Sequence, residues 1–339
     1  MRFIIVFLLS ASVALSQQLV SIETAAIGDA DNAPDTTGYG AVNYEFNIGK
    51  YEVFNSQYVT FLNAVDQGGT NSYNLYAAAQ ATNLRYGINY DSGAAGGGKY
   101  SSKPDFANKP VGFVSWFDAA RFANWVNNGA TVSASTETGA YTMTGLTSVA
   151  SYTRNPGATW WITDEDEWYK AAYYDGGTAD YWLYPTASNN VPGTITANAS
   201  GDGSAGNTGN FANYGNGAIW NGKSGMVTTV GTNGGPSAYG VYDMGGNVYE
   251  WNESVINTTN LGARGGAFND IQARLQSVTR ENDQLPTTEY GSFGFRLATV
   301  PEPSSCALLS IFSIGLAGCL IRRRKAAKSF HSPPSGPQK

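Results

Sequence analysis

Residues 239–251 read YGVYDMGGNVYEW and form the most informative stretch of the chain. Two shorter blocks follow it, RGGAF at residues 264–268 and GFRLA at residues 294–298. From the residues alone, the first block is typical of a tight turn in which Asp243 and Glu250 accept hydrogen bonds, because paired glycines permit backbone angles that other residues avoid. Its tryptophan is a candidate for the core.

The positions of cysteine and histidine narrow the possible chemistry. Both cysteines and the only histidine lie near the C-terminus, at Cys306, Cys319 and His331. Residues 17–300 therefore lack both residue types, which excludes disulfides, thiolate or imidazole zinc sites, Ser-His-Asp triads and Cys-His dyads there. Carboxylate, hydroxyl, amide, lysine, arginine and aromatic side chains remain.

The same region is strongly acidic. Seven of the 20 basic residues and one of the 26 acidic residues lie outside residues 17–300, so the region holds 13 basic and 25 acidic side chains, a net charge near −12. This balance disfavours a nucleic-acid partner. It suits either a hard cation such as calcium or a solvated acidic surface. Many Gly, Asn, Ser and Thr residues with few charges are typical of a loop-rich exported protein.

Both ends of the chain carry export signals. Arg2, an apolar run at residues 3–9 and the small residues after it predict a secretory signal peptide at residues 1–16. At the other end, an apolar run at residues 306–321 is stopped by the basic residues 322–325. This pattern predicts a transmembrane segment whose C-terminal side stays inside the cell.

The C-terminal segment, residues 300–325, resembles the PEP-CTERM sorting signal of exported bacterial proteins. Val-Pro-Glu-Pro precedes its apolar run and its basic stop. The resemblance implies anchoring in the membrane, recognition by an exosortase-type sorting machinery, and release to the cell surface or extracellular matrix. A basic and polar tail at residues 326–339 extends beyond the usual end of such signals, so cleavage of the tail stays open.

Apolar periodicity and capping patterns predict three helices. Asn55 can cap the first, Ser115 with Asp118 forms a capping box for the second, and Thr163 with Asp166 forms one for the third. The predicted helices cover residues 55–65, 116–125 and 167–173.

The blocks quoted first resemble the signature of the formylglycine-generating enzyme family, the sulfatase-modifying factors. Further landmarks of that family follow its order at residues 52–63, 110–120 and 163–172. The resemblance implies one domain at residues 17–299. It predicts an α+β fold of the irregular formylglycine-generating type, which is C-type-lectin-like and low in regular secondary structure.

The resemblance also places the two copper-binding cysteines of active members at Asp270 and Leu275. A leucine cannot bind a soft cuprous ion, and one carboxylate does not replace two thiolates. No copper is therefore expected. The iron-dependent sulfoxide synthases of the same fold need histidines, so no iron is expected in residues 17–300 either.

A calcium site is implied at the residues that match one family site: Asp243, Gly246, Val248 and Glu250. Two carboxylates with backbone carbonyls suit a hard cation, and a tight turn held by the two carboxylates is the alternative.

A second family calcium would use Asn213 and Tyr214. The resemblance places Ser224 where its later carboxylate should be, so this second site is doubtful.

Arginines and aromatic residues are the other candidates for a site. Arg264, Arg274 and Arg280 could pair with nearby acidic residues, and Arg296 is interpreted as a structural ion-pair partner. Eight aromatic side chains exceed the apparent needs of one core; most are expected inside it, and some could stack on sugars or peptides. These are Trp160, Trp161, Tyr173, Tyr174, Tyr181, Trp182, Tyr184 and Trp220.

The sequence thus predicts an exported protein of the cell surface or extracellular matrix, whose sulfatase-modifying-factor-type domain is a non-catalytic binding module for a glycan or an exported protein. The alternative is an enzyme that acts on exported sulfatases or related substrates by a cysteine-independent route, with Asp270 and nearby arginines as its polar groups. A matrix component whose only specific interaction is calcium-assisted folding is a third possibility.

Overall fold

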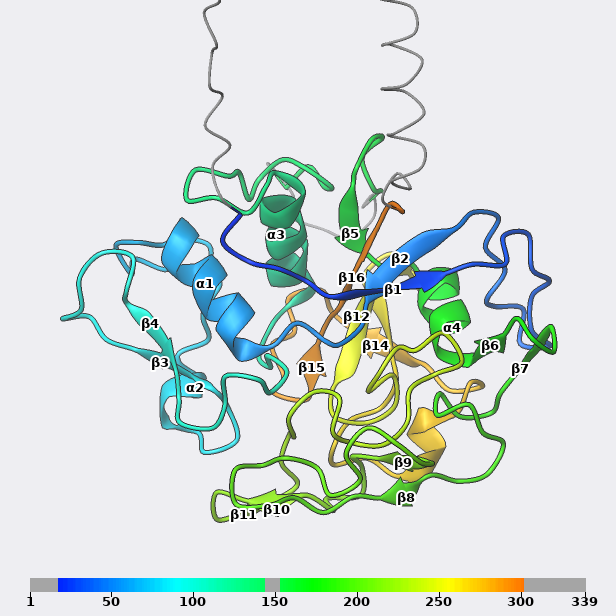
Figure 1. Cartoon of the computed structure of the whole chain (residues 1–339). Helices are drawn as coiled ribbons and strands as arrows, with labels where there is room; N and C mark the ends of the chain where they lie inside the picture. The colour runs from blue at the N-terminus through cyan, green and yellow to red at the C-terminus, as the bar shows by residue number, and fades with distance from the viewer. Residues whose placement is uncertain (1–17, 144–152, 302–339) are drawn as a thin grey trace, which may run out of the picture. The chain divides into compact units, whose positions relative to one another are not determined.

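The computed structural model describes residues 18–143 and 153–301 (Figure 1). The predicted signal peptide, transmembrane segment and C-terminal tail lie outside these residues. The described elements belong to one unit that ends at Val300. Among the helices of the described ranges, none is long and apolar enough to span a membrane.

One four-stranded antiparallel sheet joins the beginning of the domain to its end. Its strand order is β1-β2-β16-β5. The closing strand β16 lies between two strands from earlier in the chain, and Ile48, Ile162 and Leu297 on these strands are completely buried. The strands are β1 (Thr24–Ile27), β2 (Phe46–Gly49), β5 (Trp160–Ile162) and β16 (Leu297–Thr299).

A second four-stranded sheet includes residues of all three sequence blocks quoted first: Tyr249–Trp251, Arg264 and Gly294. Its order is β14-β13-β12-β15, with β12 antiparallel to β13 and parallel to β15. The register between β12 and β13 shifts after Trp251, which marks a bulge or irregularity. The strands are β12 (Tyr249–Val255), β13 (Leu261–Arg264), β14 (Glu281–Gln284) and β15 (Phe293–Gly294).

Three longer helices are present where the sequence predicted them: α1 (Asn55–Val65), α3 (Trp116–Asn127) and α4 (Glu165–Tyr173). The capping box of α3 is confirmed, since the Asp118 backbone N–H donates to Ser115 Oγ at 3.2 Å and Asp118 Oδ2 accepts from the Ser115 backbone N–H at 2.8 Å.

The predicted caps of the other two helices were wrong by one position. Asp164, not Thr163, caps α4: its Oδ1 accepts from the Glu167 backbone N–H at 2.7 Å, and its own N–H donates to Glu167 Oε2 at 2.8 Å. Asn55 is the first residue of α1 and not its cap. Its Nδ2 instead donates to the Lys109 carbonyl at 2.9 Å, which ties the helix start to a distant loop.

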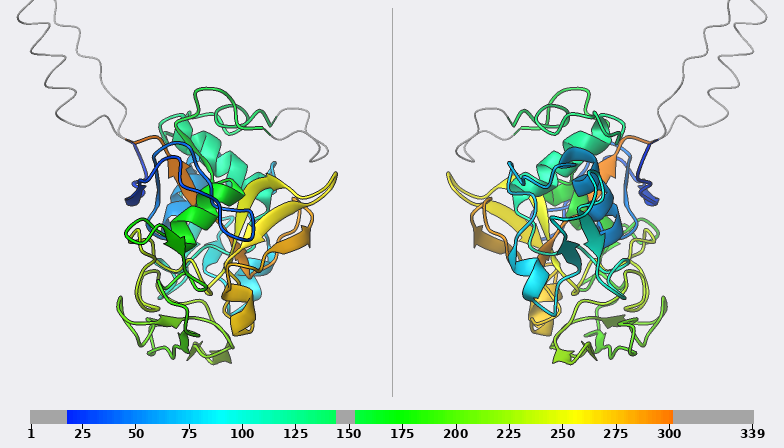
Figure 2. Two further views of the ribbon diagram at one scale, coloured as in Figure 1. Left: turned by 90° about the vertical axis from the view of Figure 1, so that its right-hand side faces the viewer. Right: turned by 90° about the vertical axis from the view of Figure 1, so that its left-hand side faces the viewer.

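The remaining elements are short, and loops connect most of them, which confirms the irregular α+β fold. In Figures 1 and 2 the small strands β8 to β11 lie at the end of the unit opposite α3. These elements are α2 (Ala79–Thr82), β3 (Ile88–Tyr90), β4 (Tyr100–Ser102), β6 (Tyr174–Asp175), β7 (Asp180–Tyr181), β8 (Gly193–Thr194), β9 (Phe211–Ala212), β10 (Ile219–Trp220), β11 (Lys223–Ser224) and the 3-10 helix η1 (Gln272–Leu275).

Aromatic rings fill the main core. The ring centroids of Phe61 and Phe122 lie 5.3 Å apart where α1 meets α3, and Trp125 lies 5.4 Å from Phe61. Trp251 on β12 is completely buried and lies 4.9 Å from the ring of Phe293. Such offset and edge contacts add stability of about 0.5–1.5 kcal/mol per pair beyond the burial of apolar area.

Candidate functional site

The two positions that the family resemblance assigns to cysteines have different surroundings. Leu275 is completely buried in a small apolar cluster with Tyr184, Ala212 and Tyr214. A side chain in this position contributes apolar packing to the core. The position that the resemblance assigns to the second cysteine is therefore part of the core.

Asp270, at the other position, is partly exposed and makes contacts within its own turn. Its Oδ2 accepts from the Ala267 backbone N–H at 2.9 Å. Burial, together with the neighbouring Asp270 carboxylate, raises the pKa of the Tyr249 hydroxyl. Asp270 thus fixes the turn after the RGGAF block and lies beside a neutral tyrosine.

A cavity of about 420 Å³ lies next to this turn. Aromatic, amide and hydroxyl groups line it, and its only charged side chain is an arginine. The lining residues are Arg85, Tyr86, Phe113, Asn216, Phe268, Asn269, Tyr290, Gly291 and Ser292.

The backbone of Phe113, in the wall of this cavity, is strained. Phe113 has a φ of +55°, whereas the φ of +59° at Asn216 is one that an asparagine accepts readily. A bulky aromatic residue rarely adopts such an angle, at a cost of roughly 1–3 kcal/mol. The Phe113 backbone N–H donates to the Tyr290 carbonyl at 3.1 Å. The Phe113 ring packs edge to face on the Tyr86 ring, with 4.0 Å between the ring centroids. Strain of this kind persists where the surroundings impose it, and it often marks binding sites.

Gly291 is required beside the same rings. A Cβ atom at this position would lie 1.8 Å from the Tyr86 hydroxyl oxygen. Any larger residue would therefore displace the Tyr86 ring from the cavity wall.

The residues of the predicted calcium site make strong contacts to protein groups. Glu250 is buried and is bound by Arg296 through two contacts of 2.5 Å, Nε to Oε2 and Nη2 to Oε1. Trp168 Nε1 donates to the same Oε2 at 2.7 Å. The sequence interpretation of Arg296 as a structural ion-pair partner is confirmed.

Asp243 is also satisfied by protein donors. Its Oδ2 accepts from the Gly231 backbone N–H at 2.5 Å, and its Oδ1 accepts from Asn233 Nδ2 at 2.9 Å. Burial raises the pKa of Asp243. The residue itself has a φ of +58°, as a tight turn requires.

These residues fit a calcium ion only in part. A cation at Glu250 would lie beside the Arg296 guanidinium, which repels it. Gly246 lies beside Asn213 through an isolated bridge, while Val248 is buried in a separate apolar cluster. Within residues 18–143 and 153–301, no group of three or more acidic, histidine or cysteine side chains is arranged to hold a metal ion.

The second predicted calcium site retains one suitable oxygen. Asn213 Oδ1 is buried and has no hydrogen-bond partner, so it is an available acceptor. The Tyr214 hydroxyl donates to the Pro192 carbonyl at 2.6 Å, and Ser224 is exposed on β11. Both calcium sites stay predictions.

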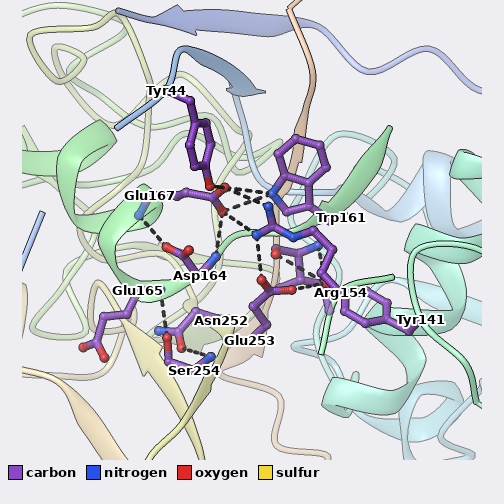
Figure 3. A network of polar contacts seen from close by, with 11 residues as sticks. Tyr44, Tyr141, Arg154, Trp161, Asp164, Glu165, Glu167, Asn252, Glu253 and Ser254 are labelled. Carbon is purple, nitrogen blue, oxygen red and sulfur yellow. Dashed lines mark hydrogen bonds and ion pairs between the residues drawn. The ribbon is translucent and has the colours of Figure 1, made fainter. Parts of the chain in front are cut away.

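Figure 3 shows a polar network that sequence reasoning missed, because its members come from four separate segments: Tyr44, Tyr141, residues 154–167 and residues 252–254. Arg154 forms ion pairs with Glu167 at 3.0 Å and Glu253 at 2.6 Å. Its guanidinium carbon lies 4.3 Å from the centroid of the Trp161 ring. Tyr141 donates to Glu253 at 2.7 Å. The network links α4, β5 and β12 through ion pairs and hydrogen bonds between protein groups, which indicates a structural role.

The arginines of the C-terminal third mostly form ion pairs with acidic side chains of the domain. Arg264 and Arg280 both pair with Glu165, at 2.7 and 2.6 Å. Arg274 is exposed and lies 4.0 Å from Glu281. They are therefore ion-pair partners of the fold.

Five of the eight aromatic residues singled out in the sequence are buried in the core, which confirms the expectation for most of them. Trp160, Tyr181 and Trp182 are only partly buried. The rings that do line a cavity, Tyr86 and Tyr290 among them, stand alone in polar loops, so sequence pattern gave no signal for them. The five buried members are Trp161, Tyr173, Tyr174, Tyr184 and Trp220.

Two known families match the sequence of this chain. Residues 22–300 match the family described as "Sulfatase-modifying factor enzyme 1-like domain". The chain belongs to this family. Residues 299–325 match the PEP-CTERM protein-sorting motif, which indicates an exported protein that the exosortase sorting machinery recognises. None of the curated proteins compared with this sulfatase-modifying-factor-like chain matches it.

Several solved structures are similar to this one. The structure titled "Crystal Structure of CarF" is 20% identical, covers 83% of this chain and 99% of its own, and has a TM-score of 0.51. Treponema denticola variable protein 1 is 18% identical, with 83% and 96% covered and a TM-score of 0.45. PvdO from Pseudomonas aeruginosa is 18% identical, with 83% and 92% covered and a TM-score of 0.36. At these identities the likeness to CarF shows the fold alone.

Proposed function

We propose that this sulfatase-modifying-factor-like domain is a non-catalytic binding module that holds a saccharide in the cavity beside Asp270. The observation behind the proposal is the pairing of an intact fold with Asp270 and Leu275 at the positions of the cysteines. Leu275 is sealed in an apolar cluster and Asp270 holds a turn. Neither side chain can take the role of a copper-binding thiolate.

The composition of the cavity supports a saccharide as its ligand. A sugar ring has an apolar face of C–H groups and a rim of hydroxyls, so it binds best between aromatic rings and fixed hydrogen-bonding groups. Tyr86, Phe113 and Tyr290 provide rings, and Asn216 and Asn269 provide amides. The volume of about 420 Å³ lies in the usual range for small-ligand sites.

The sorting motif supports the proposal, because it indicates export, and saccharides are plentiful outside the cell. Export followed by recognition by an exosortase would bring the domain to the cell surface or the extracellular matrix. A binding module in that place attaches its chain to surface polymers without any turnover.

The test is binding of the purified full-length chain to an array of neutral and acidic oligosaccharides. Tyr290 is 57% exposed, so Tyr290→Ala removes a ring of the cavity without disturbing the core. We expect about fivefold weaker binding, the loss of one aromatic contact. Tyr73→Ala, which removes another exposed tyrosine outside the cavity, serves as the control and should bind as the wild type does.

Two results would overturn the proposal. One is the absence of binding to every oligosaccharide on the array, with capture of exported peptides instead. The other is turnover of a sulfatase-derived cysteine peptide with copper supplied. Turnover without copper that Asp270→Ala abolishes would favour the enzyme alternative with a cysteine-independent route.

A further inference from the structure

We infer that the saccharide is acidic, and that Arg85 together with Lys223 binds its carboxylate or sulfate group. This inference rests on the proposed function, because it names the ligand class of the same site. It depends on the position of Arg85, on its lack of an acidic partner, and on a second cavity that Arg85 shares.

Arg85 lines two cavities. It lines the cavity of about 420 Å³ beside Asp270 and also a neighbouring cavity of about 510 Å³. Lys223, on the exposed strand β11, lines the second cavity, along with the polar side chains of Thr82 and Asn83. A ligand in the first cavity can therefore place a substituent in the second, within reach of both cations.

Two carbonyls hold the Arg85 side chain in place. Its Nε donates to the Gly225 carbonyl at 3.0 Å and its Nη2 donates to the Ser224 carbonyl at 3.0 Å. Its Nη1 makes no hydrogen bond to any described residue. The guanidinium is thus pre-oriented with donors remaining, so a ligand that binds it loses little side-chain entropy.

Arg85 is exceptional among the arginines of residues 18–143 and 153–301, because it has no carboxylate within ion-pair distance. Lys223 likewise forms no ion pair in these ranges. Each of the other arginines lies within 4.0 Å of a carboxylate: Arg121, Arg154, Arg264, Arg274, Arg280 and Arg296.

The charge of the two cavities differs from that of the domain. Residues 17–300 carry a net charge near −12, yet no acidic side chain lines either cavity. An acidic polymer is repelled by most of such a surface and attracted only where the local charge is positive. Charge-assisted contacts from a guanidinium to a carboxylate or sulfate are short and directional, and they would fix the orientation of the sugar.

The test compares acidic oligosaccharides with neutral ones of equal length on the same array. Uronic-acid oligosaccharides, their methyl esters and sulfated oligosaccharides distinguish a carboxylate from a sulfate as the bound group. We expect binding to at least one acidic series, at least about tenfold weaker binding of its neutral counterpart, and a comparable loss in Arg85→Gln.

Two further variants control this test. Arg85→Lys keeps the charge but loses the planar fork, so it should bind with intermediate affinity. Lys99→Gln removes one positive charge from a residue that lines neither cavity and should bind as the wild type does. The melting temperatures of the variants show whether the fold is intact.

The outcomes separate the two proposals. Equal binding of acidic and neutral members, reduced by Tyr290→Ala but not by Arg85→Gln, would overturn the acidic ligand and retain the saccharide site. An equal loss of binding in Lys99→Gln and Arg85→Gln would mean that the ligand is attracted by charge without specificity. This result would also overturn the acidic ligand. No binding to any member would overturn both.

Discussion

Arg296 holds Glu250 through two parallel contacts of 2.5 Å in the interior of the domain, where both side chains are almost completely buried. The pair joins the closing GFRLA block to β12. Arg296 also donates from Nη1 to the Gly49 carbonyl at 2.9 Å and from Nη2 to the Tyr242 carbonyl at 3.0 Å. One guanidinium thus connects three segments that lie far apart in the sequence.

Removal of one partner of this pair should be strongly destabilising. Arg296→Met leaves Glu250 as an uncompensated buried charge, for which a loss of about 3–5 kcal/mol in the free energy of unfolding is expected. The double variant Arg296→Met with Glu250→Leu removes both charges and should lose clearly less than the sum of the single changes. Urea unfolding followed by tryptophan fluorescence measures both values. Additive losses would show that the two residues do not act as a pair.

Stability should fall as pH rises through the range in which Asp164 ionises. Burial, and then the charge of Glu167, raises the pKa of Asp164 from 3.8 to about 8. The folded state therefore binds one more proton than the unfolded state between these values. The contribution of this proton to the free energy of unfolding is fully present below about pH 4 and is lost as pH rises through 8.

Asp164→Asn tests this dependence. Asparagine keeps the cap of α4 but cannot ionise, so unfolding between pH 5 and pH 9 should show a flatter profile than the wild type. Asp91→Asn, in an exposed turn, should leave the profile unchanged. A wild-type profile that rises over this range would contradict the expected protonation.

Calcium should compete with Arg296 for Glu250 if the predicted site at Asp243 and Glu250 exists. We expect a small rise in melting temperature when calcium is added to the wild type and a larger rise in Arg296→Met, whose Glu250 is no longer paired. Glu250→Ala should remove the response in both backgrounds. A calcium-dependent rise that Glu250→Ala leaves intact would exclude Glu250 as a ligand, and Asn213→Ala would then test the second site.

The strained ring of Phe113 should matter more for binding than for stability. Phe113→Asn supplies a residue that accepts a φ of +55°, which relieves strain, while it loses the edge-to-face contact with Tyr86. The two effects are each about 1 kcal/mol and should nearly cancel in urea unfolding. Binding to the oligosaccharide array should weaken about fivefold or more. Unchanged binding would remove this ring from the site.

Much of the fold could be predicted from local patterns. Ser115 and Asp118 capped α3 as expected, because capping depends on residues three positions apart. The prediction for α4 chose Thr163 where Asp164 is the cap, since two adjacent residues can both accept the hydrogen bond and only the packed helix selects one. Asn55 was misassigned because its partners, the carbonyls of Phe106 and Lys109, are more than 50 positions away.

The sequence by itself identified the family and the C-terminal sorting motif, and it predicted Asp270 and Leu275 at the positions that the resemblance assigns to the two cysteines, because these depend only on residue identity and order. Tertiary structure alone decided that Arg296 pairs with Glu250, which of the eight aromatic rings lie in the core, and that Arg85 lines one cavity with Tyr290 and another with Lys223. The physical reason is that burial and ion pairing are set by contacts between distant segments, which no local pattern of residues specifies.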